Sequence, residues 1–139
     1  MKPMQLASVA VTLGLMLGAV SPAHAQHTAP PAGGYKKVSA ITTLPDFIPG
    51  LGTLYVDPAT LPAGPFLAYD KQGTLVSSIY MIPLKDLNAQ KAFENLGTAH
   101  NEPVDHVDVV YNPGHAGVAE PHYHVILWYV TKAQAAKLQ

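Results

Sequence analysis

The chain contains no cysteine and no arginine among its 139 residues. Without thiols it can form neither a disulfide nor a thiolate metal site, so a small domain of this sequence must be stabilised by its core, by association or by a bound ion. Without arginine it lacks the bidentate phosphate clamp that nucleotide and nucleic-acid sites favour. All 8 basic residues are lysines, and the formal net charge is only −1. We therefore expect no nucleic-acid partner.

Long apolar runs are also scarce, and the run near the N-terminus is typical of a secretory signal. Lys2 provides a positive start, residues 6–20 are mostly apolar, and the sequence AHA at 23–25 is an A-x-A cleavage site. The run is shorter than the roughly 20 apolar residues that a transmembrane helix needs. We therefore expect residues 1–25 to be a signal peptide, the protein to be exported to the periplasm or the extracellular space, and the mature chain to have no membrane-spanning segment.

The rest of the sequence predicts a flexible linker at residues 26–37 and a single β-rich domain at residues 38–139. The linker is rich in proline, glycine and alanine and shows no hydrophobic period. Dense prolines and glycines between positions 41 and 65 confine any strands there to short pieces. We expect strands at residues 52–56, 66–69, 74–82, 104–111 and 122–130.

The same sequence predicts one internal helix and one short C-terminal helix. Pro83 suits the first turn of a helix over residues 84–96, and Gly97 suits the position after its end. Thr131 can cap a terminal helix that runs through Leu138. This order of elements, in which the sheet dominates, predicts an α+β fold that is mainly antiparallel β, with a small curled or barrel-like sheet.

Histidines are concentrated near the C-terminus, with five of the seven between His100 and His124. Two polar pairs there have a spacing of two residues, namely His106 with Asp108 and His122 with His124. Residues two apart on a strand point to the same face. The last two predicted strands can therefore present three imidazoles and one carboxylate side by side.

The opposite face of this hairpin is apolar and aromatic, and we expect it to be core. Its members are Val107, Val109, Tyr111, Tyr123, Val125, Leu127 and Tyr129. Two antiparallel registers are open: Asp108 lies opposite His122 in one and opposite His124 in the other. Both registers keep the polar groups together, because only a slip by one residue would separate them.

Imidazoles with a carboxylate suit a divalent transition metal such as zinc, copper, manganese or iron. The candidate metal ligands are His106, Asp108, His122 and His124, with His115 and Glu120 of the intervening loop as candidate additional ligands. The alternative interpretation is a polar strand face turned to water. In that case Asp108 would only hold a histidine by a hydrogen bond.

Five short motifs resemble an uncharacterised family of exported bacterial proteins that carries a domain of unknown function. The motifs are GTLY at 52–55, LPAGP at 61–65, YMIP at 80–83, DHVD at 105–108 and PHYH at 121–124. The resemblance covers residues 50–131. It implies a compact β-rich fold and assembly into a ring or another homo-oligomer.

This chain departs from the family pattern in its last strand. His124 stands where the family is expected to have an aspartate, and Ile126 stands where it is expected to have a second histidine. The His-x-His pair also resembles a fragment of the cupin metal motif. Cupins place a glutamate three or four residues later, whereas this chain has Leu127 and Trp128 there.

Two functions follow from these residues. The first is a non-catalytic exported domain that binds a metal or small ligand through the histidine-rich strand face, or assembles through it. The second is a small cupin-like metal-dependent enzyme, in which the ion keeps an open position and Glu120 acts as base. The absence of arginine, cysteine and a glycine-rich phosphate loop favours the first.

Overall fold

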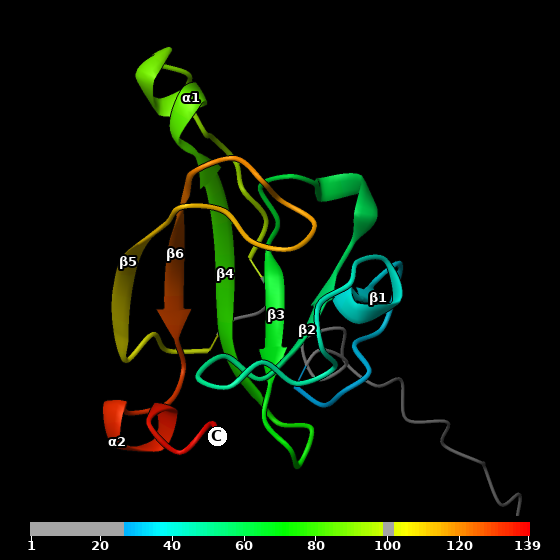
Figure 1. The fold of residues 1–139 in the computed structure, drawn as a ribbon. Coiled ribbons are helices and arrows are strands. Elements are labelled where there is room, and N and C mark those ends of the chain that lie inside the picture. The colour runs from blue at the N-terminus through cyan, green and yellow to red at the C-terminus, as the bar shows by residue number, and fades with distance from the viewer. Residues whose placement is uncertain (1–26, 99–101) are drawn as a thin grey trace, which may run out of the picture.

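The computed structural model describes residues 27–98 and 102–139, so the predicted signal peptide lies outside the described residues. The described residues form a six-stranded antiparallel sheet in the order β1-β2-β3-β4-β6-β5 (Figure 1). The strands are β1 (Lys36–Lys37), β2 (Thr53–Val56), β3 (Phe66–Tyr69), β4 (Leu75–Pro83), β5 (His106–Asn112) and β6 (His122–Trp128). The predicted fold class, mainly antiparallel β with a small helical part, is confirmed. The sheet is open, with β1 and β5 at its edges, and is not a closed barrel.

The internal helix is much shorter than the sequence predicted. Helix α1 spans Leu84–Asn88, whereas the prediction extended to residue 96. Gln90 and Asn95 have φ angles of 57° and 54°, which lie outside the right-handed helical region. The predicted apolar stripe also has little to pack on, since Leu87 is 42% exposed. A short helix without a packed face is not sustained by its propensity alone.

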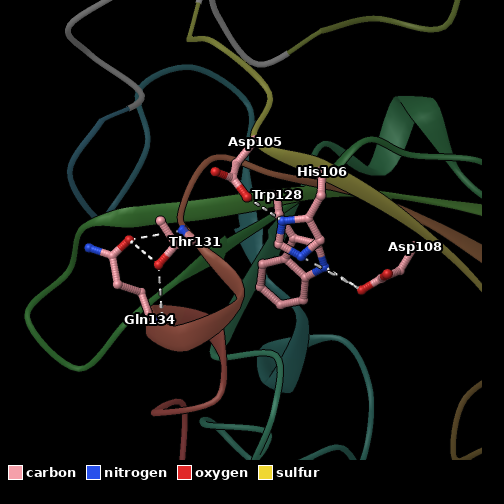
Figure 2. A network of polar contacts seen from close by, with 6 residues as sticks. All are labelled: Asp105, His106, Asp108, Trp128, Thr131 and Gln134. Carbon is pink, nitrogen blue, oxygen red and sulfur yellow. Dashed lines mark hydrogen bonds and ion pairs between the residues drawn. The ribbon is translucent and has the colours of Figure 1, made fainter.

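The C-terminal helix is present but is also shorter than predicted. Helix α2 spans Lys132–Ala135 and begins after Thr131. The Thr131 hydroxyl accepts a hydrogen bond from the Gln134 backbone N–H, and the Gln134 side chain accepts one from the Thr131 backbone N–H (Figure 2). This capping box fixes the start of the helix. Within the described part of the chain, no helix is long and apolar enough to cross a membrane.

The described part of the segment predicted as a linker contacts the turn between β3 and β4. The Ala29 N–H donates to the Gly73 carbonyl oxygen at 2.8 Å, and the Leu75 N–H donates to the His27 carbonyl oxygen at 3.0 Å. Further along, β1 pairs with β2 and adds an edge strand to the sheet. These contacts are largely made by the backbone, so the composition of the segment gave no sign of them.

The core lies on both faces of β4, which is buried along its whole length. One cluster of buried side chains contains Ala68, Val76, Ile79, Ile126, Trp128 and Leu138. The other contains Leu67, Tyr69 and Leu75, with Ala29, Tyr35, Tyr55 and Tyr129 packed against it. Phe47, Leu51 and Leu54 pack on the first cluster, so the proline-rich segment between β1 and β3 covers the face that carries the histidines.

The apolar face of the last hairpin, predicted to be core, is exposed along β5. Three β5 residues predicted as core are instead exposed: Val107 by 53%, Val109 by 63% and Tyr111 by 50%. Ile126 and Trp128, which share a face with the histidines, are each only 5% exposed. The physical reason is that β5 is an edge strand, and the covering segment packs on the histidine side of the sheet.

The register of the hairpin differs by two residues from the second of the two predicted alternatives. Asp108 pairs with Ile126, Val110 pairs with His124, and Asn112 pairs with His122. The alternation of strand faces is preserved, because a shift of two residues keeps each side chain on its own side. The shift nevertheless moves Asp108 away from both β6 histidines along the hairpin.

A pair of truncations tests which residues of the hairpin are buried and which are exposed. Ile126→Ala should lower the free energy of unfolding by about 2–5 kcal/mol, because it leaves a cavity in the core. Val109→Ala should lower it by less than about 1 kcal/mol, because the side chain is exposed on an edge strand. Urea denaturation of both variants and the parent measures the difference. A larger loss for Val109→Ala would contradict the arrangement of the hairpin.

Candidate metal centre

Strand β6 brings the rings of His122 and His124 together. The two residues are two apart on the strand, so they share a face, and their Nε2 atoms lie 3.0 Å apart. His122 is fully buried and is flanked in the sheet by Pro83 on β4 and Asn112 on β5. His124 is half-buried and lies beside Met81 on β4.

The loop between β5 and β6 adds a third histidine. Its backbone reverses between His115 and Val118, which exchange two hydrogen bonds of 2.8 and 2.9 Å. Gly117 has a φ of +85° in this turn, and a Cβ atom there would lie 3.1 Å from the Thr42 side chain. Figure 1 shows the loop extending from β5 across the sheet. The His115 ring lies 5.0 Å from that of His122 and 5.8 Å from that of His124, centroid to centroid.

Two of the three rings have their tautomers fixed by backbone carbonyls. Nδ1 of His122 lies 2.7 Å from the Glu120 carbonyl oxygen, and Nδ1 of His115 lies 2.9 Å from the Ala116 carbonyl oxygen. A carbonyl can only accept, so each Nδ1 carries the proton and each neutral ring keeps a lone pair on Nε2. Such outer hydrogen bonds are typical of metal-binding histidines, because they orient the ring and raise its basicity.

The spacing of the three rings is close to that of a three-histidine metal site. Zinc–imidazole bonds are about 2.0–2.1 Å long, so the nitrogens of a tetrahedral site are about 3.4 Å apart. One ligand atom from each of His115, His122 and His124 can be chosen so that all three lie within 4.8 Å of one another. Small ring movements are therefore enough to close a site with one coordination position left open. Nitrogen donors of this kind suit zinc, copper, iron or nickel.

Burial keeps His124 neutral. Desolvation lowers the pKa of its imidazole to about 4, and the neighbouring rings of His122 and His115 contribute in the same direction. At neutral pH the ring therefore carries a lone pair and no charge. A metal ion can bind it without first displacing the second ring proton of an imidazolium.

The structure places His106 and Asp108 in a separate network (Figure 2). Nδ1 of His106 lies 2.7 Å from an Asp105 carboxylate oxygen, and the His106 ring stacks on Trp128 at 5.9 Å between centroids. The indole N–H of Trp128 donates to Asp108 at 2.8 Å, while Nε2 of His106 is 4.0 Å from the same oxygen. His106 pairs with Trp128 rather than with a histidine, because the register places it at the other end of β6.

The carboxylate of Glu120 is not part of the histidine group. It forms an exposed ion pair with Lys85 at 2.7 Å, and only its backbone carbonyl contacts His122. Of the two loop residues considered as additional ligands, His115 therefore joins the β6 histidines and Glu120 does not. The structure divides the predicted ligand set: His122, His124 and His115 converge, whereas His106, Asp108 and Glu120 bind other groups.

A cleft of about 850 Å³ adjoins the histidine cluster. His115 and His124 line it at one end, and Asp108 and Trp128 line it further along the hairpin. The cleft is also lined by apolar residues of the proline-rich segment, among them Ile41, Leu44, Leu51 and Leu61, and by Leu54 of β2. The coordination position left open by the three imidazoles is thus next to an apolar space.

The sequence showed neither which segment would cover the histidine face of the hairpin nor that His115 would lie against His122 and His124. The proline-rich segment shows no periodicity, so nothing in it indicated which side of the sheet it would cover. A signal for His115 existed, since it lies between two glycines in a loop that returns directly to His122. Glycines at 114 and 117 permit the tight reversal that brings the ring back over β6.

The low pKa of His124 predicts a pH dependence of stability. As pH falls from 6.5 towards 4, the unfolded chain takes up a proton at this position that the folded chain excludes. The free energy of unfolding should therefore fall across this window, and it should fall less in the variant His124→Gln. Urea denaturation in the presence of a chelator, at several pH values, measures both slopes. Equal slopes for parent and variant would contradict the assignment.

Comparisons with known proteins show a likeness to a solved structure. Neither the family models nor the curated proteins include a match to the chain. Among solved structures, the crystal structure of hypothetical protein TTHB210 from Thermus thermophilus is similar, with 50% sequence identity and a TM-score of 0.62. The alignment covers 68% of this chain and 86% of that one. This chain therefore belongs to the same protein family as hypothetical protein TTHB210.

Proposed function

We propose that this protein is an exported, non-catalytic domain that binds one divalent transition-metal ion through His115, His122 and His124. The observation that supports the proposal is the convergence of these three rings. In two of them Nδ1 donates its proton to a backbone carbonyl, so Nε2 carries a lone pair that can bind a metal. Three neutral nitrogen donors favour zinc or copper over magnesium or calcium, which prefer oxygen. The ion would also join the β5–β6 loop to strand β6 of the sheet.

The placement of the site adds support. His122 is fully buried, and an imidazole buried in a protein needs a partner for both nitrogens. Its Nε2 lies 3.0 Å from Nε2 of His124 and, because its own proton is on Nδ1, can accept a hydrogen bond from that ring. A bound ion would replace this single bond by ligation of three rings and would stabilise the folded chain by mass action.

The enzyme interpretation is less well supported by the contacts around the site. It requires a base beside the ion, and Glu120 was the candidate. That carboxylate instead pairs with Lys85 and is exposed, and it does not line the cleft that holds His115 and His124. Asp108 does line the cleft, but it accepts the indole N–H of Trp128 at the other end of the hairpin. A binding site therefore fits the geometry better than a hydrolytic centre.

Zinc titration of metal-free protein tests the site. Calorimetry should show one zinc ion per chain, and His122→Ala or His124→Ala should weaken binding by at least tenfold, because each removes one of three ligands. The matched control is His106→Ala, which removes a histidine of the same hairpin outside the cluster. It should leave the zinc affinity unchanged within about a factor of three.

Cobalt substitution gives an independent measurement of the same site. Cobalt(II) bound by three imidazoles should give visible absorption bands, and these should be lost in His115→Ala. If cobalt binding is lost in His106→Ala but retained in His115→Ala, the metal is bound by the network of His106 and Asp108 instead. No stoichiometric zinc or cobalt in the parent protein would refute the proposal.

A further inference from the structure

The cleft beside the histidine cluster has polar groups at two places and an apolar surface between them. Near the cluster it is lined by His115, His124 and Asn112, and further along it is lined by Asp108. The rest of its lining is largely aliphatic or aromatic, and none of the described residues that line it is lysine. Among these described residues, the carboxylate of Asp108 is therefore the only fixed charge.

The length of the cleft follows from the strand that forms its floor. His124, Ile126 and Trp128 all line it from β6, with side chains on the same face. Four residues of extended strand separate the first from the last, which corresponds to about 13 Å. Val110 and Asp108 on β5 run beside them, because Val110 pairs with His124 and Asp108 with Ile126.

We propose that this cleft binds a single-chain carboxylic acid of medium length, with its carboxylate on the metal ion and its uncharged tail lying along β6 toward Trp128. The inference rests on the proposed metal site, because no described residue that lines the cleft is a lysine that could offset an anionic head. Burial of an alkyl chain against the apolar walls would favour binding, because it removes apolar surface from water.

Charge complementarity decides which end of the ligand lies where. The carboxylate of an acid completes the open coordination position of an ion held by three neutral imidazoles. The same group placed beside the Trp128 indole would meet the carboxylate of Asp108, which accepts the indole N–H at 2.8 Å and is negative and only half-exposed. The cleft should therefore accept a monocarboxylate and discriminate against a dicarboxylate of the same chain length.

Decanoate and its dicarboxylate analogue, decanedioate, are the probes, because their extended chains match the length of the cleft floor. Calorimetry with zinc-loaded protein should show decanoate binding at least tenfold tighter than decanedioate. Chelator-treated protein should bind decanoate at least tenfold more weakly than zinc-loaded protein. Cobalt-loaded protein should show a change in its visible spectrum when decanoate is added, since the carboxylate enters the first coordination sphere.

The variant Asp108→Asn tests the orientation without altering the metal ligands. An asparagine side-chain oxygen can still accept the Trp128 indole N–H, so the network in Figure 2 keeps this contact. The substitution should leave decanoate affinity within about threefold and raise decanedioate affinity by at least fivefold. If Asp108 had only a structural role, the substitution would change the affinities for both acids by the same factor.

The possible results separate the two proposals. If the protein binds zinc but the zinc-loaded protein binds decanoate no more tightly than the chelator-treated protein, the ligand inference is overturned and the metal site remains intact. Equal affinity for the two acids in the parent protein would also overturn it. Absence of zinc binding would refute the metal site and the ligand inference together.

Discussion

The pairing of β6 between β4 and β5 is the constraint on which the rest of the structure depends. Alternation along this strand places four side chains on one face, those of His122, His124, Ile126 and Trp128. The register with β4 and β5 determines which residues lie beside each of them. Burial of Ile126 and Trp128 against the proline-rich segment makes this face the interior one. The histidines are therefore held in a sheltered environment, and the cleft is the part of that interior that the covering segment does not fill.

The sequence was sufficient to predict strands β2 to β6 and the grouping of polar residues by face, whereas β1 lies in the segment predicted as a linker. The strands around the 70–73 turn and the β6 strand follow directly from alternation and turn residues, as does the Thr131 cap. The predicted helix over 84–96 was wrong because its apolar stripe has no partner surface. The assignment of Val107, Val109 and Tyr111 to the core was wrong for a related reason, since periodicity distinguishes two faces of a strand but does not say which one is covered.

The site was partly predictable, because strand alternation alone identified His122 and His124 as neighbours without tertiary information. Bringing in His115 required the conformation of a loop, and excluding His106 and Asp108 required the register of the hairpin. The register depends on loop length and on packing between β6 and β4, which are properties of the whole sheet. The cleft depends on where the segment before β3 lies, and its prolines give no indication of that.

In the proposed site three imidazoles, from β6 and the loop before it, bind one ion. Anomalous diffraction at the zinc absorption edge, from crystals grown with zinc, is the decisive measurement. We expect one peak per chain, about 2.1 Å from ring nitrogens of His115, His122 and His124. A peak between His106 and Asp108, or no peak among the three rings, would contradict it.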